Sequence, residues 1–311
     1  MISVVVPSFN RCDCILRLLG DLRLQEGADF EVVVVDDGST DETPARVSAE
    51  FPEVRLFVNE TNGGPCVTRN RGILEARGDL IVGLDSDVSL RDPGLLRGIR
   101  QEFDRAPSPI GIAMRLLTLD GGDDEPRWWH PVPLASGGDR EFETGYFSGT
   151  AYAFRRLDLI EAGLFPEIYY MHYEEVELAW RLLDCGVRIL HMPRFEVVHH
   201  ACSSARRNRI QVFFKPRNQI LLALRCCPFL LGLKFLVPRL AYNAGRAVLD
   251  GHAMDFFAMF KSAASLSRRC LHERRPISSA TWSRLRSMRR QAGADRHLPV
   301  RGRFHWVGGP T

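Results

Sequence analysis

Two carboxylates follow an apolar run in the stretch Gly78-Asp-Leu-Ile-Val-Gly-Leu-Asp-Ser-Asp87. A short continuous apolar run such as Leu80–Leu84 is typical of a strand that is covered on both faces of a sheet. Asp85 and Asp87 come where this strand would run out into a turn, so both carboxylates can point to one side and hold a hard divalent cation. A D-x-D pair is common by chance, and its place after a buried strand is what gives it weight.

Apolar runs alternate with helical patterns around this stretch, through the first 90 residues. Strands are expected at Ile2–Val6, Val32–Val35 and Val54–Val58, with helices between Ile15 and Leu22 and over Thr68–Ala76. Strand-helix-strand alternation predicts a sheet of parallel strands joined by right-handed crossovers.

Polar clusters follow three of the expected strands. Pro7-Ser8-Phe9-Asn10 comes after the first, Asp36-Asp37-Gly38-Ser39-Thr40-Asp41 after the second, and Asp85-Ser86-Asp87 after Leu84. Turns and helix N-caps favour the same residue types, which would explain any one cluster alone. Ligands of open α/β sheets bind at the carboxyl ends of the strands, so three such clusters together predict one shared site.

The pattern changes after residue 104. Residues 105–145 are rich in turn residues and are expected to be irregular, and their Trp128-Trp129 pair suits either a sugar-stacking platform or a packing anchor. A strand is expected over Gly145–Phe154, and an amphipathic helix over Glu174–Leu183. Two further strands are expected at Val187–Leu190 and Phe195–His199.

Composition and charge are those of a globular protein with two unlike parts. The chain has 311 residues, of which 45% are hydrophobic and 25% charged, and this excludes disordered and fibrous classes. Residues 206–311 hold 21 Lys and Arg against 4 Asp and Glu, whereas the first 205 residues hold 20 against 34. Two segments of opposite charge indicate two different partners.

The eight cysteines form neither a zinc-ligand pattern nor a disulfide framework, which favours reduced thiols in a cytosolic protein. The N-terminus Met1-Ile-Ser-Val-Val-Val-Pro7 lacks the pattern of a signal peptide. We therefore expect a cytoplasmic location.

The motifs resemble those of the family 2 glycosyltransferases. The resemblance rests, in order, on Val4–Asn10, Val33–Asp41, Asn62–Asn70, Gly78–Asp87, Tyr173–Arg181 and Gly186–His199. It implies the GT-A fold, an α/β fold with a Rossmann-like mixed sheet flanked by helices, and an inverting enzyme that uses a nucleotide-sugar donor. It covers roughly the first 200 residues.

The resemblance implies a role for each matching residue of the donor site. Pro7 lies where the first strand ends beside the nucleotide base, and Asp37 matches the carboxylate that hydrogen-bonds the base. Arg69 matches an arginine on the donor side, a residue type suited to diphosphate. Asp85 and Asp87 match the pair that serves the ribose and the metal, with Asp87 the direct metal ligand.

His199 matches a histidine near the diphosphate and metal, although His200 stands beside it, and a lone histidine is more often structural. Inversion also needs a carboxylate that takes the proton of the acceptor hydroxyl. The family usually has a Glu-Asp pair at this place and this chain has Glu174-Glu175, so Glu175 is the expected base and Glu174 the runner-up. Glu177 and Arg181 are four residues apart on this helix, which favours an ion pair between them.

The expected reaction is a single displacement with Mg²⁺ or Mn²⁺ as cofactor. The chain lacks the Q-x-x-R-W segment of processive synthases, which favours one sugar per encounter. A non-catalytic protein that binds nucleotide sugars is the alternative, supported only by the Glu-Glu pair. A dehydrogenase would need G-x-G-x-x-G after the first strand, and a nucleotidyltransferase a glycine-rich basic loop; Pro7-Ser8-Phe9-Asn10 is neither.

Two regions follow: a catalytic domain over residues 1–205, with a donor half of about 1–104 and an acceptor half of about 105–205, and a basic helical extension over residues 206–311. Charged residues and prolines interrupt the apolar segment Ile210–Leu240, so it suits helices lying on an anionic membrane better than a spanning helix. No nucleic-acid motif accompanies the arginines, so no nucleic-acid partner is expected.

Within the extension, Phe213–Asn218 resembles a segment of rhamnosyltransferase-like members. The whole chain is thus expected to move one sugar from a UDP- or dTDP-sugar, and the resemblance favours rhamnose as that sugar. The acceptor would be a glycan or lipid-linked molecule of cell-surface polysaccharide synthesis at the inner face of the membrane.

Overall fold

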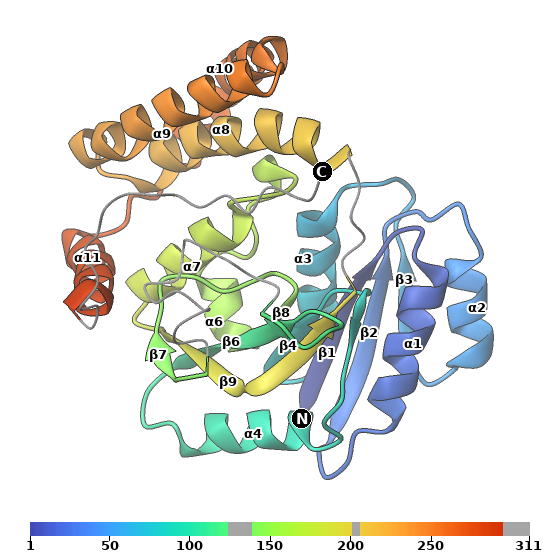
Figure 1. Ribbon diagram of the computed structural model, residues 1–311. Coiled ribbons are helices and arrows are strands. Elements are labelled where there is room, and N and C mark those ends of the chain that lie inside the picture. The colour runs from blue at the N-terminus through green and yellow to red at the C-terminus, as the bar shows by residue number, and fades with distance from the viewer. Residues whose placement is uncertain (124–138, 201–205, 295–311) are drawn as a thin grey trace.

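The structure, a computed structural model, describes residues 1–123, 139–200 and 206–294. A mixed sheet lies between helical layers, and helices from the C-terminal part pack on one side (Figure 1). The strands are β1 (Ile2–Ser8), β2 (Phe30–Asp36), β3 (Arg55–Val58), β4 (Leu80–Leu84), β5 (Val88–Ser89), β6 (Ile110–Leu117), β7 (Phe142–Glu143), β8 (Ala151–Arg155) and β9 (Arg188–His199). The helices are α1 (Cys12–Arg23), α2 (Thr43–Glu50), α3 (Pro65–Glu75), α4 (Leu95–Arg105), α6 (Arg156–Glu161), the 3₁₀ turn η1 (Glu167–Tyr169), α7 (Glu174–Asp184), α8 (Arg206–Cys226), α9 (Phe229–Leu249), α10 (Ala253–His272) and α11 (Ser279–Ala294).

The strand order is β3-β2-β1-β4-β8-β6-β9-β5, and β7 pairs with β9. β1, β2, β3 and β4 are mutually parallel, whereas β8 is antiparallel to both β4 and β6. The sheet is therefore mixed, as expected for the α/β fold. Its parallel part brings the carboxyl ends of β1, β2 and β4 to one edge, where the ligands of such sheets bind.

The apolar runs form strands because both faces of the sheet are covered. Successive side chains of a strand point to opposite faces. Val4 and Val6 accordingly pack in a core with the buried side chains of α1 and α4, and Val5 packs in a second core with Ile73 of α3 and Val176 of α7.

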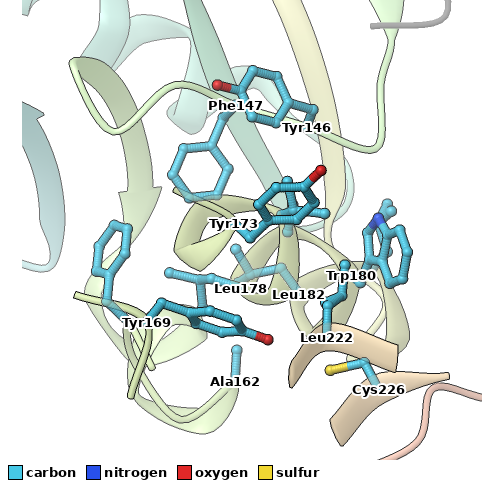
Figure 2. Packing of buried hydrophobic residues seen from close by; sticks show 14 of the residues in the cluster. Tyr146, Phe147, Ala162, Tyr169, Tyr173, Leu178, Trp180, Leu182, Leu222 and Cys226 are labelled. Carbon is cyan, nitrogen blue, oxygen red and sulfur yellow. The ribbon is translucent and has the colours of Figure 1, made fainter. Parts of the chain in front are cut away.

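The C-terminal helices share this second core. Leu222 and Cys226 of α8 lie next to Leu178 and Leu182 of α7 (Figure 2). The cysteines among the described residues are free thiols, several of them buried here, as expected of core residues. Of the helices that the structure describes, none combines the length and the hydropathy that crossing a bilayer requires.

Three expectations about secondary structure are wrong. The segment 105–145 contains β6, whose side chains are almost all buried and which pairs with both β8 and β9. The strand expected over Gly145–Phe154 begins only at Ala151. The two strands expected between Val187 and His199 are one, β9, because a register shift opposite Met114 absorbs the interruption at Pro193. Trp128-Trp129 lies outside the described residues.

Candidate active site

Asp37 directly follows β2 and is only 3% exposed. Its Oδ1 accepts hydrogen bonds from Asn59 Nδ2 at 2.8 Å and from the Gly63 N–H at 3.0 Å, and its Oδ2 accepts one from the Gly64 N–H at 2.8 Å. A carboxylate has about four acceptor positions, and Asp37 uses two of them to hold the loop that leads into α3 and one to hold Asn59 after β3. One position remains for a donor such as a base N–H.

The loops after β1 and β2 are bonded to each other beside this carboxylate. Pro7 pairs in register with Val35. Asn10, in the left-handed region with φ 50°, accepts a hydrogen bond at its Oδ1 from the Thr40 N–H at 2.9 Å, and its own N–H donates to Ser39 Oγ at 2.8 Å. These bonds hold Pro7 and Asp37 at one end of the neighbouring strands β1 and β2.

Arg69 projects from α3 to the end of β4 and is 6% exposed. Its Nη2 donates to Asp85 Oδ1 at 2.8 Å, and its Nη1 lies 4.0 Å from Glu174 Oε1. Burial opposes its charge, but Asp85 and the other groups around it outweigh burial and raise the pKa of Arg69. Nε and Nη1 have no hydrogen-bond partner among the described residues, which leaves a buried cation with donors to offer an anionic ligand.

Asp87 meets His199 rather than Asp85. His199 Nε2 lies 3.5 Å from Asp87 Oδ1, because β5 and β9 pair Val88 with His199. Burial favours the protonated acid, yet the hydrogen bond and charge of His199 lower the pKa of Asp87 overall. The neighbouring His200 turns to Ser89, with 2.8 Å between Nε2 and Oγ.

The donor set at Asp87 fits a divalent cation that also binds substrate. Within residues 1–123, 139–200 and 206–294, no group of three His, Cys, Asp or Glu side chains is placed to hold a metal. Asp87 and His199 offer one oxygen and one nitrogen side by side. Mg²⁺ typically takes only one or two protein carboxylates and completes its shell with waters and substrate phosphates, which is the arrangement that this pair permits.

The two glutamates at the start of α7 differ in environment. Glu174 is 4% exposed, and its Oε2 has no hydrogen-bond partner in the described part of the chain. Burial, and next the charge of Glu175, raise the pKa of Glu174 well above its ordinary value. Glu175 is less buried, and its Oε1 accepts a long hydrogen bond of 3.4 Å from the Gly149 N–H. The two carboxyls are thus adjacent in the chain but differ in burial, with Glu174 buried and Glu175 partly exposed.

Gly149 allows its backbone to approach this cluster. A Cβ at Gly149 would lie 3.0 Å from Arg69 Cζ and 3.1 Å from Glu175 Oε1, tighter than side chains ordinarily allow. Sequence reasoning missed Gly149, since nothing in its neighbours marks a close approach.

A second group that sequence reasoning missed fixes the turn before α7. Tyr170, His172 and Tyr173 all have positive φ, at 66°, 65° and 77°, a conformation that costs energy in residues other than glycine. Asn218 of α8 is fully buried, and its Nδ2 donates to the carbonyls of Met171 and His172, both at 2.7 Å. The segment Phe213–Asn218 was singled out by its sequence, but its partners are too distant along the chain to be inferred.

Arg217 and Arg225 extend this attachment. Arg217 Nη2 donates to the Tyr169 carbonyl at 2.6 Å. Arg225 Nε lies 3.0 Å from both carboxylate oxygens of Glu177, which is 1% exposed. The expected pair of Glu177 with Arg181 is also present, at the longer distance of 3.6 Å. Helix α8 therefore holds α7 and the turn that precedes it.

Comparison with known proteins places the chain in a family. A model of the family described as glycosyl transferase family 2 matches residues 3–163. The chain is 43% identical over 122 residues to the succinoglycan biosynthesis protein ExoO of Rhizobium meliloti, an alignment that covers 39% of this chain and 35% of ExoO. It is 26% identical over 244 residues to the N-acetylglucosaminyl-diphospho-decaprenol L-rhamnosyltransferase of Mycobacterium tuberculosis, covering 67% of this chain and 78% of that protein.

The matches with several relatives are partial. The aligned regions span 35% of ExoO, 29% of an uncharacterized glycosyltransferase of Haemophilus influenzae and 42% of a pre-mycofactocin glycosyltransferase of Mycobacterium tuberculosis. The chain thus matches less than half the length of these proteins.

Solved structures share the fold over nearly the whole chain. TarS 1–349 of S. aureus, in complex with UDP-GlcNAc, superposes with a TM-score of 0.60 at 19% identity, covering 94% of this chain and 90% of that one. The mannosyltransferase PcManGT of Pyrobaculum calidifontis, in complex with GDP-Man and Mn²⁺, gives 0.55 at 19% identity, covering 94% and 86%. The chain has the fold of these transferases, and the family match over residues 3–163 takes in Pro7, Asp37, Arg69, Asp85 and Asp87; the protein belongs to glycosyl transferase family 2.

Proposed function

We propose that this protein is an inverting glycosyltransferase that moves one sugar from a UDP- or dTDP-sugar to a glycan or lipid-linked acceptor in cell-surface polysaccharide synthesis. The observation that carries the proposal is the meeting of Arg69, Asp85 and the Glu174-Glu175 pair at the carboxyl edge of the sheet. A buried cation beside a carboxyl pair offers both a diphosphate contact and a proton acceptor within one site.

The donor would lie along this edge. Pro7 and Asp37 would contact the base, Asp85 the ribose, and Arg69 the diphosphate through the donors that it leaves unused. Asp87 and His199, with Asp85 nearby in sequence, would hold Mg²⁺ or Mn²⁺, which supplies a Lewis acid for the departing diphosphate. The complexes of TarS with UDP-GlcNAc and of PcManGT with GDP-Man and Mn²⁺ support such a donor site in this fold.

Glu175 would be the catalytic base. Its carboxylate takes the proton of the acceptor hydroxyl while that oxygen bonds to the anomeric carbon and the bond from this carbon to the diphosphate breaks. Burial and the charge of Glu175 raise the pKa of Glu174, which favours the less buried Glu175 as the base. Glu174 is the second candidate for the base.

The two halves of the chain would serve different partners. Residues 1–205 would form the catalytic domain, with donor and acceptor halves that divide near residue 104, and the basic residues 206–311 would contact an anionic membrane at the inner face of the cell. A net positive charge in this region supports the proposal. So does the lipid-linked substrate named for the mycobacterial rhamnosyltransferase.

A donor screen tests the proposal. Thermal unfolding is followed with UDP-, dTDP- and GDP-sugars, each with and without Mn²⁺, since a ligand that binds the folded state raises its apparent stability. We expect sugars of one nucleotide class to raise the unfolding temperature, and to raise it further when Mn²⁺ is present. In Asp87→Asn we expect Mn²⁺ to add no further stabilisation. No stabilisation by any nucleotide in folded protein contradicts the donor site. Stabilisation without measurable transfer favours the alternative, a non-catalytic protein that binds nucleotide sugars.

A further inference from the structure

A pocket of about 200 Å³ lies between α7, α9 and α11, away from the residues assigned to the donor. Its lining includes the rings of Trp180 and Trp282 and the cationic side chains of Lys234, Arg239 and Arg286. These helices come from different parts of the chain, and α11 packs beside α7 (Figure 1).

The lining of this pocket is positively charged. Among the residues that the structure describes, no acidic side chain lines it. Elsewhere on the same helices basic groups are paired, as with Arg284 of α11, whose Nη2 lies 2.6 Å from Glu143 Oε1. Lys234 and Arg286 are exposed and form no ion pair with a described residue. Their positive charge is therefore available to an anion.

A neutral donor accompanies the cations. Trp282 packs edge-on against Trp180 with 5.7 Å between ring centroids, and its indole N–H is buried without an acceptor in the described residues. A buried indole N–H normally finds an acceptor. A phosphate oxygen held by the neighbouring cations would supply one.

An exposed apolar face borders the pocket on α9. Leu230, Leu233 and Val237 are 71%, 46% and 62% exposed, and their spacing of three and four residues places them on one side of the helix. Phe229, at the start of α9, is 76% exposed. Lys234 follows Leu233 and joins this face to the pocket, as in helices that lie in a membrane interface with cations at the headgroup level.

We propose that this pocket binds the phosphate of an anionic phospholipid headgroup while Leu230, Leu233 and Val237 enter the acyl region of the membrane. The proposal rests on the membrane contact proposed above and adds to it a defined site with a preference for anionic headgroups. The apolar face favours a lipid over free phosphate, because a soluble anion leaves these side chains in water.

Vesicle flotation with the full chain tests this site. Phosphatidylcholine vesicles are compared with vesicles that also contain phosphatidylglycerol, and K234E/R286E is compared with K261E/R268E, which makes the same change of charge at exposed positions of α10. At about 1 kcal/mol per basic group near the surface, loss of two groups weakens binding about 30-fold. Because Lys→Glu and Arg→Glu reverse a charge rather than only remove it, we expect a loss of at least about 30-fold for K234E/R286E, and a smaller loss for the control, whose two residues do not line the pocket. We also expect L230S/L233S to weaken binding with its charge intact.

Three outcomes overturn the proposal. Equal losses of vesicle binding in K234E/R286E and K261E/R268E would mean that a basic surface attracts the membrane without a defined site. Equal binding to vesicles with and without phosphatidylglycerol would mean that no anionic headgroup is recognised. Competition by inorganic phosphate, together with unchanged vesicle binding of L230S/L233S, would mean that the pocket binds a soluble anion. Donor binding in the thermal screen is measured on the same variants. A variant that keeps donor binding but no longer floats supports a lipid site separate from the donor site, whereas unsubstituted protein that binds donor but does not float rejects the lipid site and leaves the proposed transferase intact.

Discussion

Replacing Asn218 by Ala removes the side chain that fastens the turn before α7. The substitution deletes both 2.7 Å hydrogen bonds from Nδ2 and leaves the partly buried carbonyls of Met171 and His172 without this donor. It also removes the acceptor for Arg217 Nε, which lies 2.8 Å from Asn218 Oδ1. Since the side chain of Asn218 is fully buried, water does not readily replace the hydrogen bonds that it makes.

The expected cost follows from these contacts. The three lost hydrogen bonds contribute about 1 kcal/mol each, for a total of about 3 kcal/mol. His172 and Tyr173 hold positive φ values that cost roughly 1–2 kcal/mol each, so the released turn relaxes. Glu175 lies two residues after Tyr173, so relaxation of the turn would move its carboxylate. A shift of about 1 Å at a catalytic group lowers turnover about 100-fold.

Three assays measure the effects of Asn218→Ala: urea unfolding gives the free energy of unfolding, the donor screen gives donor binding, and a transfer assay gives kcat. We expect Asn218→Ala to lower the free energy of unfolding by about 3 kcal/mol and kcat about 100-fold, with donor binding unchanged. Asn243→Ala is the control, because it removes one hydrogen bond of 2.9 Å to Gln219 in the same helical region. Unchanged kcat in Asn218→Ala, or an equal loss in Asn243→Ala, would refute the role of the turn.

Three further substitutions follow from buried contacts. Arg225→Met removes the nearer cation from buried Glu177 and leaves Arg181 at 3.6 Å, and should lower the free energy of unfolding by about 3 kcal/mol, measured in urea; a loss below about 1 kcal/mol contradicts the pairing. Gly64→Ala should lower the free energy of unfolding by about 1–3 kcal/mol for its φ of 87°, and by more because a Cβ would lie 2.7 Å from the Tyr170 ring; wild-type stability would contradict both the backbone strain and the close contact. In the unfolded state Glu174 has its ordinary pKa of 4.5, and burial raises this pKa in the folded state. Between the two pKa values the folded state holds a proton that the unfolded state has lost, so the free energy of unfolding falls as the pH rises through this range. Glu174→Gln should lack this loss in urea titrations between about pH 5 and about pH 8, and an identical pH dependence in both proteins would exclude the raised pKa.

The parallel half of the sheet could be predicted because its signals are local. Val4–Val6 and Leu80–Leu84 are continuous apolar runs, and the polar residues after them follow directly in the chain. The donor-side residues that come together, such as Arg69 and Asp85, lie in motifs whose order alone predicts their meeting at one edge.

The remaining features depend on contacts across long sequence distances. β6 was missed because turn residues on both sides hide a run that is buried only when β8 and β9 pair with it. The hydrogen bonds that Asp37 accepts from the N–H groups of the loop at Gly63 are not visible in residue types. The proximity of Asp87 and His199 was expected only from the family resemblance, because it depends on the pairing of β5 with β9. Likewise Asn218 reaches Met171 over 47 positions of sequence.

Glu175→Gln tests the central claim most directly. The amide keeps the size of the side chain but cannot take the acceptor's proton, so we expect turnover to fall about 10²–10⁴-fold while nucleotide-sugar stabilisation in the presence of Mn²⁺ stays at the wild-type level. Glu174→Gln, which replaces the buried glutamate whose pKa burial raises, serves as the matched variant and should retain most activity. Unimpaired turnover in Glu175→Gln, or loss of its donor binding, would contradict the assignment of Glu175 as the base.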